Sequence, residues 1–163
     1  MNKKRGFTLV EIMIVVAIIA VLSGIAIPNL LRARLTANEA ATITTLKTIA
    51  SAATNFAQVT GGNPTNFGSF TSASPRYLDP SFGTGNTVTR NNFFIQYGAA
   101  SGAGVPAFVV VANSTTVGSR VFYTDETGVV CAAPLSTVSS VYGSHCTSAL
   151  CPTGCPASYA IVQ

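Results

Sequence analysis

The fold of this chain is decided by the stretch KKRGFTLVE, residues 3–11, and by the apolar run that it opens. The run continues to Ile27 and contains one charged side chain, that of Glu11. It is long enough for a helix that crosses about 30 Å of hydrocarbon. A carboxylate near the centre of such a helix costs roughly 2.5 to 3.5 kcal/mol, so we expect Glu11 to have a partner and a function. The three cations before the run predict a cytoplasmic N-terminus and an exported remainder.

This stretch resembles the class III signal of type IV pilins and their pseudopilin relatives, and the likeness extends from Lys3 to about Leu31. The resemblance implies that a prepilin peptidase cuts after Gly6 and that Phe7 becomes a methylated N-terminus. It also implies that Glu11 pairs with the terminal amine of a neighbouring subunit.

Two more general interpretations of the apolar run are a signal anchor and a secretory signal peptide cut near Leu22-Ser23-Gly24. The apolar run alone would favour them. Gly6 directly before Phe7, with Glu11 following, favours the pilin-type signal instead.

A second helical pattern follows Pro28. Apolar residues recur three and four apart, at Ile43, Leu46, Ala50, Ala53 and Ala57, with Ile49 and Phe56 widening the stripe. This period predicts an amphipathic helix whose remaining surface carries Asn38, Glu39, Thr42, Thr45 and Lys47. Gly61-Gly62 predicts its end, and one helix over residues 7–60 would be about 80 Å long.

Pro28 predicts a weak point inside this helix, because proline cannot donate a hydrogen bond to the carbonyl of Gly24, four residues earlier. We expect residues 24–29 to form either a static kink or a segment that melts when helices pack in a filament. A proline here resembles the helix-breaking proline of pilins.

The remainder predicts a small antiparallel sheet. Residues 61–91 are rich in Gly, Asn, Ser, Thr and Pro and predict a long loop, in which Tyr77-Leu78-Asp79-Pro80 packs a short turn onto the domain. Strands are predicted over residues 92–97, 107–112, 119–124 and 129–132, with a hairpin turn at 125–128. The fold class is therefore α+β, a long N-terminal helix packed on a small sheet, the αβ-roll of pilins. The expected divisions are a leader (1–6), the helix (7–60, with 7–27 crossing the membrane) and a globular head (61–163).

Four cysteines lie in the exported part, at Cys131, Cys146, Cys151 and Cys155. An even number in an oxidising compartment predicts two disulfides, with Cys131 joined to the tail and the connectivity left open. Zinc is disfavoured, because these cysteines lack the paired spacing of a tetrahedral site. A calcium site like that of type II secretion pseudopilins is not expected either, because no acid follows Glu126.

Charge and motifs argue against nucleic-acid binding and catalysis. From Gly61 onward three arginines balance three acids, which is a poor surface for phosphates. His145 has no orienting carboxylate nearby in the sequence, and we expect Asp125 and Glu126 to be solvated turn residues. Asn113-Ser114-Thr115 matches a glycosylation sequon, a three-residue pattern that occurs easily by chance.

We therefore interpret the chain as a structural protein without catalytic residues, cofactor or metal. The resemblance implies a homopolymeric type IV pilus or related filament, a prepilin peptidase that also methylates, and an inner-membrane assembly platform with ATPases. It places the protein in the inner membrane before assembly and on the cell surface afterwards. The alternatives are a type II secretion pseudopilin and a membrane-anchored binding domain that does not polymerise.

Overall fold

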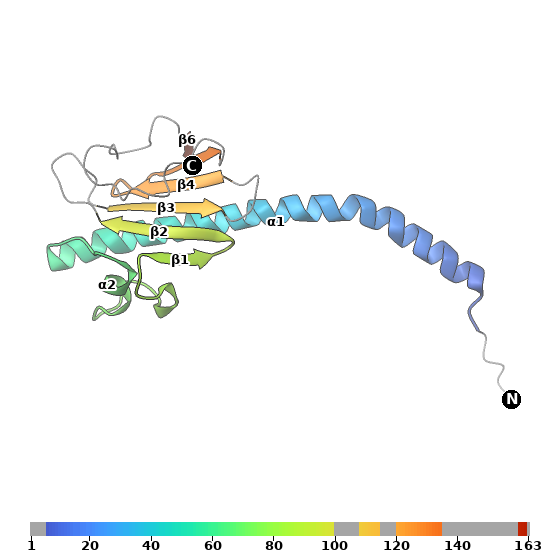
Figure 1. Ribbon diagram of the computed structural model, residues 1–163, viewed down its shortest axis with the longest axis horizontal. Coiled ribbons are helices and arrows are strands. Elements are labelled where there is room, and N and C mark those ends of the chain that lie inside the picture. Colours follow the sequence, from blue (N-terminus) through green and yellow to red (C-terminus); the bar gives the residue numbers. More distant parts are fainter. Residues whose placement is uncertain (1–5, 100–107, 115–119, 135–159, 163) are drawn as a thin grey trace. The chain divides into compact units, whose positions relative to one another are not determined.

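The computed structural model describes residues 6–99, 108–114, 120–134 and 160–162. The chain divides into two compact units, Met1–Ala37 and Asn38–Gln163. Helix α1 (Leu9–Thr60) contributes its first part to unit 1 and the rest to unit 2 (Figure 1). The long N-terminal helix predicted from the sequence is thus confirmed.

Unit 1 consists mainly of the apolar part of α1. Leucine, isoleucine, valine and alanine dominate this stretch, and their large side chains are exposed. Among the described residues α1 is the one helix long and apolar enough to cross a membrane, and its most apolar window has no buried residue. The helix assignment continues through Pro28.

Unit 2 contains a six-stranded antiparallel sheet in which neighbours in sequence are neighbours in space (Figure 1). The hydrogen-bonded order is β1 (Thr87–Arg90), β2 (Phe93–Ala99), β3 (Phe108–Ser114), β4 (Arg120–Asp125), β5 (Val130–Pro134) and β6 (Ala160–Val162). Four of these strands match the four predicted from β-branched and aromatic residues, with ends shifted by one or two residues.

The core of unit 2 lies between the second part of α1 and one face of the sheet. Leu46, Ile49 and Ala53 of the predicted helical stripe are fully buried and belong to the same apolar cluster as Ile95 of β2 and Val110 of β3. The predicted fold class, a long helix packed on an antiparallel sheet, is therefore correct.

Four of the five helix residues that we expected on the surface are not fully exposed, since Thr42 is buried and Asn38, Glu39 and Thr45 are half-buried. Thr42 is fully buried, because its hydroxyl donates to the carbonyl of Asn38 at 2.8 Å and leaves its methyl group free to pack. The Glu39 side chain is 13% exposed, because it is held by Arg120.

The predicted loop over residues 61–91 is wrong in part, since it contains three short elements. They are α2 (Phe67–Thr71), the 3-10 helix η1 (Pro80–Phe82) and strand β1. Asn66 caps α2 by accepting from the Ser69 amide, and Asp79 caps η1 by accepting from the Ser81 amide. The expected turn at residues 77–80 is confirmed, because Leu78 is buried in the main core.

The hairpin turn between β4 and β5 is also confirmed, but Asp125 is 1% exposed rather than solvated. One of its carboxylate oxygens accepts from the amide of Thr127 at 2.9 Å and from the Thr127 hydroxyl. Gly128 closes the turn with a φ of 72° and donates its amide to the Asp125 carbonyl. A positive φ of this size favours glycine.

Both faces of the central strands are buried. Phe122 and Val130 face α1, while Val109, Tyr123 and Cys131 form a second apolar cluster from the alternate positions of β3, β4 and β5. Since side chains alternate between the two faces of a strand, this cluster lies on the side of the sheet away from α1.

Candidate functional site

The most distinctive site lies at the start of α1, where Thr8 and Glu11 bond to each other. The Thr8 amide donates to Glu11 Oε2 at 3.1 Å, and the Glu11 amide donates to Thr8 Oγ1 at 3.3 Å. The Thr8 hydroxyl also reaches Oε2, at 3.0 Å. This reciprocal arrangement is a capping box, and it satisfies amides that the first turn of a helix leaves unpaired.

The capping box changes the interpretation of Glu11. Its carboxylate is in the first turn of α1 and not near the middle of the apolar run, so the cost of burying it is lower than a central position implies. Among the described residues, Oε1 accepts no hydrogen bond while Oε2 is held by Thr8. The oriented carboxylate therefore keeps one oxygen available for a cation outside this chain.

The residues just before the helix are exposed and have free space around them. Gly6 and Phe7 precede the first helical residue, and Phe7 is 84% exposed. A Cβ atom built on Gly6 would meet nothing within 4 Å, and Gly6 has no positive φ. Packing within the described part of the chain thus does not require glycine at this position.

Beyond the capping box α1 presents apolar side chains all round. Large residues from Leu9 to Leu31 are 50–75% exposed. A soluble helix would expose such a surface only on a small patch. This part of α1 therefore needs either lipid or other apolar helices around it.

Gly24 and Pro28 lie within this apolar part. The helix assignment is unbroken across them, and a Cβ built on Gly24 would meet nothing within 4 Å. The carbonyl of Gly24 nevertheless lacks its usual amide donor, because residue 28 is a proline. The expected weak point at residues 24–29 stays a prediction.

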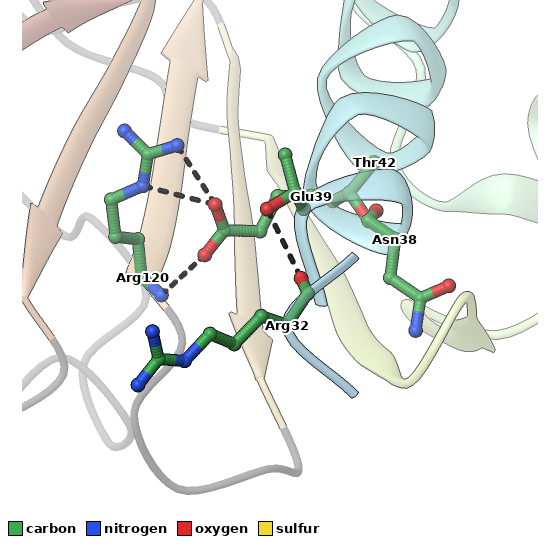
Figure 2. A network of polar contacts seen from close by, with 6 residues as sticks. Arg32, Asn38, Glu39, Thr42 and Arg120 are labelled. Carbon is green, nitrogen blue, oxygen red and sulfur yellow. Dashed lines mark hydrogen bonds and ion pairs between the residues drawn. The ribbon is translucent and has the colours of Figure 1, made fainter. Parts of the chain in front are cut away.

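A second polar site, which no local sequence pattern predicts, joins α1 to β4 (Figure 2). The guanidinium of Arg120 donates to Glu39 Oε2 from Nη2 at 2.8 Å and from Nε at 3.2 Å. The Arg120 amide donates to Glu39 Oε1 at 3.1 Å, so both carboxylate oxygens are engaged. The two residues are 81 positions apart, and no local pattern connects them.

The predicted disulfide residues are described only in part. Cys131 is fully buried on β5 and is held in a disulfide-bonded form. Cys146, Cys151 and Cys155 lie outside the described residues, as does His145. The pairing of the four cysteines stays a prediction.

Two of the residues considered as polar sites, Asn113 and Asp125, are buried. Asn113 is 1% exposed on β3, so its amide is not presented for modification in the folded chain. Asp125 is buried in the hairpin turn described above. Within the described ranges no group of three His, Cys, Asp or Glu side chains could hold a metal ion.

Comparison with known proteins places the helix start in a defined class. A family profile described as the prokaryotic N-terminal methylation motif matches residues 1–27. Residues of the capping box and the exposed apolar helix lie within this match.

The relatives that match are pilins. The chain is 56% identical over 39 residues to the type IV wide pilus major component PilA4 of Thermus thermophilus. This alignment covers 24% of this chain and 30% of PilA4. It is 44% identical over 54 residues to the type IV major pilin protein PilA of Myxococcus xanthus, covering 33% and 24% respectively. The chain thus matches about a quarter to a third of the length of these relatives, and no solved structure matches it. The N-terminal segment is similar to that of these type IV pilins.

Proposed function

We propose that this protein is a structural subunit of a type IV pilus, cleaved after Gly6, methylated at Phe7 and polymerised through the first part of α1. The observation that carries the proposal is the start of α1, where Glu11 is oriented by Thr8 and keeps Oε1 available. It lies directly before an apolar helix surface of which no residue is buried in the described part of the chain.

The chemistry of assembly follows from that geometry. Cleavage after Gly6 creates a positive amine on Phe7, and Thr8 remains in place to hold Glu11. A neighbouring subunit's amine can then bond to the open carboxylate oxygen, a charge-assisted contact that is strong in a site without water. The pair would set the register between adjacent helices.

The partners of this process are part of the proposal. They are further copies of the chain, a prepilin peptidase that also methylates, and an inner-membrane assembly platform with cytoplasmic ATPases. The subunit would wait in the inner membrane with its C-terminal unit exported, and the polymer would lie on the cell surface. The missing amide at Pro28 supports local unwinding at residues 24–29 as helices pack.

Two disulfides among the four cysteines complete the proposal for the exported unit. The buried, oxidised Cys131 on β5 supports a link from the sheet to the tail. If Cys131 pairs with Cys146, a loop of about 16 residues would be closed, which contributes roughly 3 kcal/mol in the chain-entropy model.

Processing and assembly are tested separately. Mass spectrometry of the mature protein should find methylated Phe7 as the first residue, and Gly6→Val should leave the precursor uncut in the membrane. Glu11→Leu should be inserted and cleaved as in the wild type yet join filaments poorly, whereas Thr8→Val should weaken assembly less because it leaves the carboxylate in place. A mature chain that begins near Gly24 would exclude the pilin-type signal. Normal filament yield from Glu11→Leu alone would exclude the register mechanism.

A further inference from the structure

The charge-free part of α1 ends at two arginines that the proposed function does not use. Residues 12–31 carry no charge, and Arg32 and Arg34 are the first charged side chains after Glu11. At about 1.5 Å per residue this run of 20 residues spans about 30 Å, which is the thickness of the hydrocarbon layer. A helix inserted to this depth holds both guanidinium groups at the headgroup level.

Neither arginine is neutralised within the described part of the chain. Both side chains are exposed, and neither makes an ion pair with a described residue. Glu39, the next acid along α1, has both carboxylate oxygens bound by Arg120.

The spacing of the two arginines indicates what kind of partner they fit. Residues two apart on a helix point about 200° from each other, because each residue turns the helix by about 100°. A docked protein would contact one side of α1 and leave the other cation unpaired. A layer of lipid headgroups surrounds the helix and offers phosphate to both, and long arginine side chains extend readily to that layer.

We propose that Arg32 and Arg34 bind anionic lipid headgroups at the exported end of the apolar run and fix the depth of the subunit in the membrane. This inference rests on the proposed membrane-inserted precursor. The pair has a role once leader cleavage has removed Lys3, Lys4 and Arg5, because the apolar run then has cationic side chains beside it only at its exported end.

The test is a lipid-selectivity measurement on the full chain, reconstituted in vesicles of phosphatidylcholine and phosphatidylglycerol at about three to one. Spin-labelled forms of the two lipids report how strongly each is retained beside the helix. Arg32→Gln/Arg34→Gln should lower the preference for phosphatidylglycerol about fivefold or more, since each basic residue at an anionic surface contributes a factor of about five. Arg32→Lys/Arg34→Lys should keep most of it, and high salt should reduce the wild-type preference.

The matched control is Lys47→Gln, which removes an exposed cation of α1 from the unit that contains the sheet and should leave the preference unchanged. The inference is overturned if the double glutamine variant keeps the wild-type preference or if Lys47→Gln lowers it equally. It is also overturned if the double variant loses filaments in cells while its lipid preference is intact, because the arginines would then serve a neighbouring subunit. Resistance to alkaline extraction is scored in parallel. Its loss in the wild type would contradict membrane insertion, and so the proposed function, rather than the role of the arginines.

Discussion

The contact between Glu39 and Arg120 makes a quantitative prediction about unit 2. Glu39→Ala removes three hydrogen bonds, two from the guanidinium and one from the Arg120 amide. Arg120→Ala removes only the two guanidinium bonds, because the amide stays in place. The loss of Glu39 should therefore break one more hydrogen bond than the loss of Arg120.

The magnitude follows from the exposure of the two partners. The Glu39 side chain is 13% exposed and that of Arg120 is 48% exposed, so water partly screens the ion pair. When Glu39 is removed, water can hydrate the guanidinium of Arg120 again. We expect Glu39→Ala to lower the free energy of unfolding by about 1 to 2 kcal/mol and Arg120→Ala by about 1 kcal/mol. The arginine also lies 5.5 Å from the ring centre of Phe122, a contact that adds about 0.5 kcal/mol to the second value.

A double-mutant cycle isolates the pair from these other contributions. Once Glu39 is absent, removing Arg120 should cost little more than its contact with Phe122, so the coupling energy should be about 1 kcal/mol. The assay is thermal unfolding of the full chain in mild detergent, followed by near-ultraviolet circular dichroism. Raising the salt from about 0.05 to 0.5 M should reduce the coupling. A coupling below about 0.3 kcal/mol at low salt would refute the reasoning.

Two further predictions concern residues of the same unit. Tyr97→Phe should raise the free energy of unfolding by about 1 kcal/mol, because the buried Tyr97 hydroxyl has no hydrogen-bond partner among the residues that the structure describes. Burial also raises the pKa of Tyr97, so the free energy of unfolding of the wild type should fall as the pH rises above about 10, where tyrosine ionises in the unfolded chain. Tyr97→Phe should lose less stability over the same pH range. Equal losses of stability at alkaline pH, measured by denaturant titration, would contradict this. Gly128→Ala should lower the free energy of unfolding by about 1 to 2 kcal/mol, because residue 128 has a positive φ. Gly62→Ala is the control and should lower it little, because Gly62 has open space around it and no positive φ. Similar melting temperatures for the two variants would contradict this prediction.

The parts of the fold that the sequence predicted are those with a repeated local signal. Leu46 and Ile49 recur at helical spacing, and the strands through Ile95, Val110 and Phe122 are rich in β-branched and aromatic residues. A long periodic segment buries the same apolar face whatever element packs against it, so the face read from the sequence is the face that is buried in the folded chain.

Short elements were missed because tertiary contacts stabilise them. Strand β1 has four residues and β6 has three, and each forms by pairing with one neighbour in the sheet. The Glu39–Arg120 contact depends on the whole fold, which brings together residues from α1 and β4. The capping box is different, since Thr8 followed three residues later by Glu11 is a readable signature of a helix start. Because Glu11 lies in a membrane-type run, we interpreted it from the sequence by its charge and not by its position in the first turn of the helix.

The capping box also decides how much assembly can gain from Glu11. A carboxylate already bonded to the amide and hydroxyl of Thr8 is not a bare charge in the membrane, so the amine of a neighbouring Phe7 relieves only part of its cost. The apolar side chains add little preference for the polymer, because moving a helix from lipid into a helical bundle exchanges one apolar surface for another. Close packing must then supply most of the binding energy, and Glu11 must supply the register. Glu11→Gln separates the two, because the amide can still cap Thr8 but carries no charge for the amine. It should insert and be cleaved normally and form filaments in reduced number. Filaments at the wild-type level from Glu11→Gln would mean that capping, and not charge, is the contribution of this residue.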